Sequence, residues 1–132
     1  MRSIEAAREQ AIADGVRPIP PTVYRGLLGF FPAALLQRAR FGAGGRPILL
    51  PAVPLRYGDP AAVTLGDVIL FRDERSAGDL DLWAHGLTHM MQVQRWGLHG
   101  YVTRYVADSM ALEQEANDNA ARFAEWRGRR IG

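Results

Sequence analysis

Hydrophobic positions in the second half of the chain recur every three or four residues, which is the spacing of one helix face. The pattern predicts a helix from Ser76 to about Trp96, begun by a capping-box-like Ser76-x-x-Asp79 and ended by Gly97. The face that we expect to enter the core carries Leu80, Trp83, Ala84, Leu87, Met90 and Met91.

A last helical pattern runs roughly from Val106 to Trp126. One stripe of this helix is expected to carry Glu113, Asn117, Ala120 and Ala124. The small residues in the stripe would let a neighbouring helix approach closely.

The segment before these helices has the signature of strands. Ala62–Leu65 and Val68–Phe71 are rich in β-branched and other apolar residues, and they flank the two-residue turn Gly66–Asp67. This arrangement predicts a β-hairpin. Two apolar pieces punctuated by proline, Pro47–Leu50 and Ala52–Leu55, precede it.

The first 45 residues consist of short segments separated by glycine and proline. The order of helices, a small sheet and two further helices predicts an α+β fold. The length of 132 residues predicts a single domain over residues 1–132, of which residues 1–21 are an N-terminal helix and a proline-rich connector. The predicted elements are a helix at Ser3–Asp14 ended by Gly15, an extended connector at Arg17–Pro21, helical stretches within Tyr24–Arg40 interrupted near Gly29 and Pro32, and a loop at Gly42–Gly45.

Composition narrows the chemistry. Cysteine is absent, which excludes disulfides and thiolate metal sites. All sixteen basic residues are arginine, and with the many Ala and Gly this indicates a GC-rich bacterial genome. The net charge is only +2, so there is no specific nucleic-acid signal, and we expect the run Arg127–Arg130 to be a solvated tail.

No stretch is apolar for long enough to span a bilayer, and the charged N-terminus does not resemble a signal peptide. We therefore expect a bacterial protein that is cytoplasmic or delivered by a dedicated secretion system. A peptide or protein is the expected kind of partner, and the oligomeric state is open.

All the histidines, His85, His89 and His99, lie within fifteen residues of one another. His85 and His89 are four residues apart and so share one face of the predicted helix. Gln92 and Trp96 are expected on the same face, where they would support the histidines or line the pocket. Two neutral imidazoles so placed can bind one Zn²⁺. His99 is expected to lie in a loop or on the surface.

A catalytic zinc site has three protein ligands and one open position. The best candidate for the third ligand is Glu113 on the last helix. Glu115 is the alternative, although it points about 200° away around the same helix. His99 is a poorer candidate, because the third histidine of the metzincin pattern falls at a position held here by Arg95.

Several segments together resemble the zincin-like metallopeptidase domains found with bacterial toxins and extracellular contractile injection systems. These domains have the pattern Leu-x-Ala-His-Glu-Leu-Thr-His, two hydrophobic residues and Gln, followed by a Glu-x-x-Ala-Asp helix. The chain has LWAHGLTHMMQ at residues 82–92 and EQEAN at residues 113–117. The hairpin at 63–72 and the helix entry at 31–35 are also similar, and the resemblance covers roughly residues 25–125.

The resemblance implies a zinc site with His85, His89 and Glu113 as metal ligands. It also exposes two departures. The glutamate that acts as general base in the His-Glu-x-x-His signature is replaced by Gly86, and the second-shell aspartate is replaced by Asn117.

The leading hypothesis is therefore a degenerate metallopeptidase-like domain that keeps its metal site, is impaired in hydrolysis and serves a toxin or secretion locus as a binding module. One alternative is an active zinc peptidase with another base, such as Asp108 or Glu115. Another is a metal-free structural or interaction domain. A glycine inside a helix costs about 1 kcal/mol. On propensity alone, Gly86→Glu should therefore stabilise the helix while restoring the base.

Overall fold

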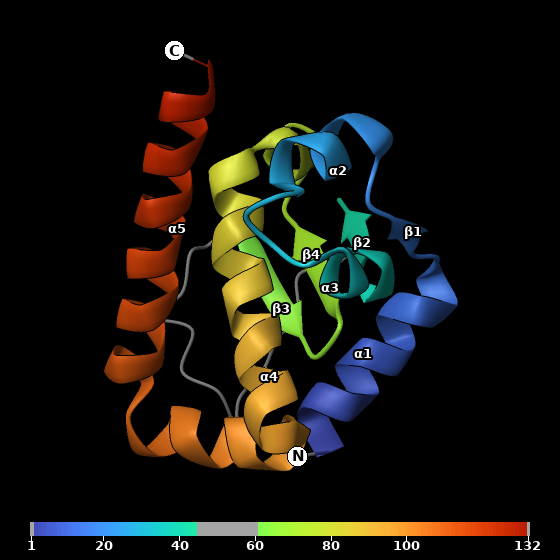
Figure 1. The fold of residues 1–132 in the computed structure, drawn as a ribbon. Coiled ribbons are helices and arrows are strands. Elements are labelled where there is room, and N and C mark those ends of the chain that lie inside the picture. Colours follow the sequence, from blue (N-terminus) through green and yellow to red (C-terminus); the bar gives the residue numbers. More distant parts are fainter. Residues whose placement is uncertain (1, 45–60, 132) are drawn as a thin grey trace.

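The computed structural model describes residues 2–44 and 61–131, and their helices and strands form an α+β fold (Figure 1). This confirms the fold class expected from the sequence. The predicted apolar pieces at Pro47–Leu50 and Ala52–Leu55 lie outside the described residues. The helices are α1 (Arg2–Asp14), α2 (Pro21–Leu27), α3 (Ala33–Arg38), the 3-10 turn η2 (Ser76–Gly78), α4 (Leu80–Ala107) and α5 (Ser109–Ile131). The strands are β1 (Arg17–Pro18), β2 (Arg40–Ala43), β3 (Ala62–Leu65) and β4 (Val68–Phe71).

The N-terminal segments follow their glycine and proline signals. Helix α1 ends at Gly15, whose φ of 105° is readily adopted by glycine alone. Helix α2 begins at Pro21, three residues before the predicted Tyr24, because proline is well suited to the first turn of a helix. Gly29, with a φ of 100°, and Pro32 separate α2 from α3 as predicted.

The strands form a mixed sheet in the order β1-β2-β4-β3. The predicted hairpin is confirmed, since β3 and β4 are antiparallel and the turn residue Gly66 has a φ of 71°. The predicted loop at Gly42–Gly45 is wrong at its start, because Gly42 and Ala43 belong to strand β2. This strand pairs in parallel with β4, with Phe41 opposite Ile69, and a partner so distant in sequence leaves no local signal.

Helix α4 is the middle layer of the fold, with α5 along one side and the sheet on the other (Figure 1). Its N-cap is Asp79, whose carboxylate accepts hydrogen bonds from the backbone N–H groups of Asp81 and Leu82 at 3.0 and 3.2 Å. The predicted start at Ser76 is therefore early. At Gly97 the backbone leaves the helical region (φ 74°, ψ 164°), which confirms the predicted end, and a second helical piece then continues to Ala107.

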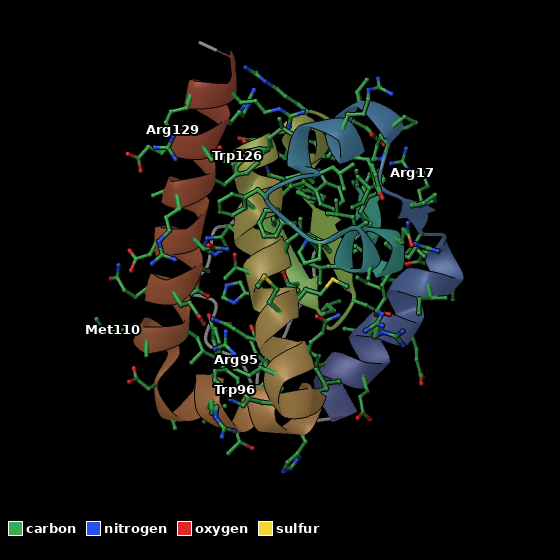
Figure 2. All side chains as sticks on the ribbon, in the orientation of Figure 1. Arg17, Arg95, Trp96, Met110, Trp126 and Arg129 are labelled. Atoms are coloured by element: carbon green, nitrogen blue, oxygen red, sulfur yellow. The ribbon has the colours of Figure 1, made fainter. Side chains whose placement is uncertain are left out.

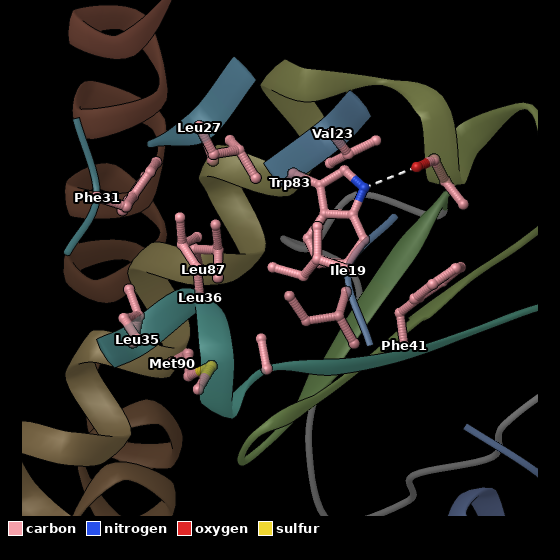
Figure 3. Packing of buried hydrophobic residues seen from close by; sticks show 14 of the residues in the cluster. Ile19, Val23, Leu27, Phe31, Leu35, Leu36, Phe41, Trp83, Leu87 and Met90 are labelled. Atoms are coloured by element: carbon pink, nitrogen blue, oxygen red, sulfur yellow. Dashed lines mark hydrogen bonds between the residues drawn. The ribbon is translucent and has the colours of Figure 1, made fainter. Parts of the chain in front are cut away.

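The larger hydrophobic core lies between α4, the sheet and the short helices (Figure 3). Trp83 is fully buried, and its indole N–H donates a 2.7 Å hydrogen bond to the carbonyl of Ala77. Its ring packs against Phe41 and Phe71, with centroids 5.5 and 4.8 Å away. The core face predicted for α4 is confirmed at Trp83, Ala84, Leu87 and Met90, which are all buried.

Helix α5 faces α4 with a stripe that differs from the predicted one. Asn117 and Ala124 are exposed, whereas Ala116 and Phe123 are fully buried. The buried row runs from Glu113 through Ala116 to Phe123, in steps of three and seven residues, so it is tilted relative to the stripe that we expected.

Candidate metal centre

Three potential ligand atoms from two helices meet at one point. His85 and His89 come from α4 and Glu113 from α5. The Nε2 atoms of the two histidines are 3.2 Å apart, and Glu113 Oε1 lies 3.0 Å from the His85 nitrogen and 3.2 Å from the His89 nitrogen. Two ligands bonded to zinc at about 2.0–2.1 Å with tetrahedral angles lie about 3.3 Å apart. The spacing of the three atoms is thus close to that of a filled site.

The donor set itself fits a cation. A neutral imidazole can present a lone pair at Nε2, and in that tautomer His89 Nε2 and Glu113 Oε1 are two facing acceptors. A bound metal ion satisfies the lone pairs of all three ligand atoms at once. Two histidines and one glutamate are therefore positioned to hold a metal ion.

The cluster is buried at one end and more open at the other. His89 is 5% exposed and Glu113 6% exposed, while the His85 side chain is 18% exposed. Burial by itself would raise the pKa of Glu113, but its contacts with His85 and His89 and the hydrogen bond donated by Tyr105 outweigh it, and the net effect lowers the pKa below its ordinary range. Glu113 is thus an ionised carboxylate, which is the form that binds metal.

Tyr105 holds the second oxygen of this carboxylate. Its hydroxyl donates a 2.7 Å hydrogen bond to Glu113 Oε2, which leaves Oε1 directed at the histidines. Burial, together with the hydrogen bond to Glu113, raises the pKa of Tyr105, so the phenol remains a donor. Tyr101 lies beside it, with its hydroxyl 3.4 Å from His89 Nδ1.

The Nδ1 edge of the His89 imidazole contacts Gln92, a fully buried residue one turn further along α4. The distance from His89 Nδ1 to Gln92 Oε1 is 2.9 Å. The Gln92 amide also donates to Glu115 on α5, and Arg95 donates to the same carboxylate. The hydrogen bond from Arg95 is the main reason that the pKa of Glu115 is lowered.

The position that would carry the general base is closed by the sheet. Gly86 is buried, and a Cβ placed on it would lie 3.0 Å from Ile69 Cδ1 and 3.3 Å from Thr64 Oγ1. The Thr64 hydroxyl also donates a long, 3.4 Å hydrogen bond to the Gly86 carbonyl. The expectation that Gly86→Glu stabilises the protein rests on helix propensity, and the packing opposes it, because a longer side chain has to displace buried groups.

Within the described residues, the side chains of Asn117, Trp96 and His99 make no hydrogen bond to those of His85, His89 or Glu113. Asn117 is exposed and takes no part in the hydrogen bonds of the described residues around the histidines. Trp96 is half-buried, with the guanidinium groups of Arg95 and Arg104 at 5.0 and 4.7 Å from its ring (Figure 2). His99 is exposed, as we expected.

Three polar residues of this region, Tyr101, Tyr105 and Asn119, were not predicted from the sequence. Tyr101 and Tyr105 reach the cluster because the chain bends at Gly97, and their spacing of four residues after that glycine is the signal that could have found them. Asn119 donates a 3.0 Å hydrogen bond to Thr88 and so links α5 to α4. No spacing rule indicates that contact.

Part of the chain that contains the two histidines matches a known protein family. Residues 55–97 match the family described as the eCIS core domain, which supports an association with extracellular contractile injection systems. The match includes the β3–β4 hairpin, His85 and His89, and it ends before Glu113. Searches of curated proteins and of solved structures found no match. Within the described residues, no helix has the length and apolar character needed to cross a membrane.

Proposed function

We propose that this chain is a zincin-like domain that binds a metal ion but is impaired in hydrolysis, and that it acts as a binding module of a toxin or contractile injection system. The observation that carries the proposal is the convergence of His85, His89 and Glu113 on one point, beside a glycine at the position of the general base. The match to the eCIS core domain supports the secretion context.

Zinc is the metal that best suits the site. Two imidazole nitrogens and one carboxylate oxygen are a ligand set used by zinc, and no thiolate is available. When bound, zinc would act as a Lewis acid and lower the pKa of a coordinated water. The protein supplies the supporting contacts, since Tyr105 orients Glu113 and Gln92 orients His89.

The replacement of the general base argues against efficient hydrolysis. General acid–base catalysis typically contributes about 10²–10⁴-fold, and Gly86 has no group that could supply it. The two substitute bases considered from the sequence are engaged elsewhere. Asp108 accepts a hydrogen bond from the backbone of Ala111 at the start of α5, and Glu115 lies on the Nδ1 side of His89, away from the ligand atoms.

The metal site can be tested by zinc titration of the purified protein with calorimetry and elemental analysis. The wild type is expected to bind one zinc ion, and His89→Ala is expected to lose this stoichiometric binding. His99→Ala is the matched control, because it removes an exposed histidine from the same α4 helix and should leave the zinc content unchanged. Full zinc occupancy in His89→Ala would show that the ligands lie elsewhere.

Hydrolysis needs a separate assay. Zinc-loaded and metal-free wild-type protein should be incubated with a mixture of unstructured peptides and the products identified by mass spectrometry. We expect no zinc-dependent cleavage, or cleavage slower than that of ordinary zinc peptidases by the factor given above. Rapid zinc-dependent cleavage would favour the alternative of an active peptidase with another base.

A further inference from the structure

We infer that Glu115 and Arg95 are positioning residues for the metal ligand His89 and that they act on it through Gln92. The inference rests on the proposed metal-binding function. It concerns residues that contact neither the metal position nor the other two ligands, and it assigns a role to an ion pair that otherwise looks like an ordinary surface contact.

The orientation of the Gln92 amide decides which nitrogen of His89 carries the proton. Its Nε2 group donates to the carbonyl of Leu112 at 3.1 Å and to Glu115 Oε1 at 2.8 Å. Both of these partners can only accept, so the amide nitrogen must face them and the amide oxygen must face His89. A flipped amide would place two acceptors against its oxygen.

The amide oxygen in turn selects the His89 tautomer. Because Gln92 Oε1 lies 2.9 Å from His89 Nδ1, this nitrogen must be the one that donates. The lone pair is then on Nε2, which faces His85 and Glu113. Hydrogen-bonded partners of this kind orient metal-bound histidines and raise their basicity.

Glu115 presents a negative charge as well as a second acceptor to the Gln92 amide. It is a carboxylate, so its hydrogen bond with the amide is charge-assisted and polarises the Gln92 oxygen towards His89. Arg95 keeps the carboxylate in place with two bonds, from Nη1 to Oε1 at 3.2 Å and from Nη2 to Oε2 at 3.0 Å. The chain of contacts therefore runs from Arg95 through the Glu115 carboxylate and the Gln92 amide to the buried imidazole. Arg95 itself lies at the side of α4 that faces α5 (Figure 2).

A purely structural role predicts a different outcome. The side chains of Arg95 and Glu115 are 46% and 42% exposed, and an ion pair that exposed contributes little to stability. Losing it should then change unfolding slightly and metal binding not at all. A positioning role predicts a loss of metal affinity that exceeds any loss of stability of the metal-free protein.

The experiment compares wild type, Glu115→Ala, Glu115→Gln and Arg95→Ala. Zinc affinity is measured by competition with a chromophoric chelator, the geometry of the site by the visible absorption of the Co²⁺ form, and the stability of the metal-free protein by urea unfolding. Glu125→Ala is the matched control, because Glu125 also pairs with an arginine on the surface of α5.

We expect Glu115→Ala to lower zinc affinity about 10–100-fold and to alter the Co²⁺ spectrum. Glu115→Gln, which keeps an acceptor for Gln92 but loses the charge, should recover part of the affinity. The zinc affinity of Arg95→Ala should lie between those of Glu115→Ala and Glu115→Gln. The zinc affinity of Glu125→Ala should equal that of the wild type. Wild-type zinc affinity and Co²⁺ spectrum in both Glu115 variants would overturn the inference while leaving the proposed metal site intact. A wild-type protein that binds no zinc would overturn both.

Discussion

The two sides of the first part of α4 have opposite characters. On the ligand side, His85 and His89 meet a carboxylate from α5, and the polar atoms behind them are held by further hydrogen bonds. On the side that carries Gly86, the helix lies against β3 and β4 so closely that a Cβ would crowd Ile69. The first side is built to keep polar groups in place, and the second is built as a packed apolar contact.

This difference supports the proposal that the chain can bind a metal ion without being an efficient hydrolase. The three potential metal ligands are held in place by contacts within and between α4 and α5. None of the described side-chain hydrogen bonds of these ligands involves residue 86, so the ligand arrangement does not require a general base there. Gly86 packs against the sheet, so a side chain added there has to shift Ile69 and Thr64.

The largest effect on stability is expected for Gly86→Glu. Helix propensity favours Glu by about 1 kcal/mol, but overpacking a buried site typically costs about 1–3 kcal/mol, and a buried unpaired carboxylate adds to this cost. We expect the free energy of unfolding, measured in urea, to fall by about 2 kcal/mol. A variant that is more stable than wild type would show that the side of α4 that carries Gly86 has room for a glutamate side chain.

A smaller variant separates the steric cause from the charge. Gly86→Ala adds only the Cβ that would meet Ile69 Cδ1 at 3.0 Å, and Ile69→Val removes that atom. The combined variant should be more stable than the sum of the single effects predicts, with a coupling of about 0.5–1 kcal/mol. Simple additivity would mean that the contact does not limit the site.

Tyr105→Phe tests the ligand side. The change removes the 2.7 Å hydrogen bond that holds Glu113 Oε2, and we expect zinc affinity to fall about 10–100-fold in a chelator competition assay. Tyr24→Phe, on α2, is the matched control and should bind zinc as wild type does. If both variants keep full affinity, the orientation of Glu113 does not depend on this hydroxyl.

Thr64→Val should have the smallest effect. It removes the hydroxyl that donates to the Gly86 carbonyl, but this bond is long at 3.4 Å, and valine suits a strand. We expect the free energy of unfolding to change by about 0.5 kcal/mol or less and zinc affinity to stay the same. A large loss of zinc affinity would show that the two sides of α4 are coupled.

The elements governed by local signals were predictable from the sequence. The hairpin follows from the Gly66–Asp67 turn between two β-rich runs, the end of the first part of α4 from Gly97, and the core face of α4 from its periodicity. The pairing of His85 with His89 is also local, because a helix places residues four apart on the same face. For each of these features, the physical cause lies within a few residues of the chain.

Only the tertiary structure decided how distant elements meet. Strand β2 exists through its parallel pairing with β4, and the row of α5 that contains Ala116 is set by close packing on α4. The bend at Gly97 brings Tyr105 back to Glu113, and the sign of the Gly86→Glu effect depends on Ile69 across the helix–sheet contact. These outcomes depend on distances between segments far apart in the chain, and a local spacing such as that of Tyr101 and Tyr105 after Gly97 does not fix those distances.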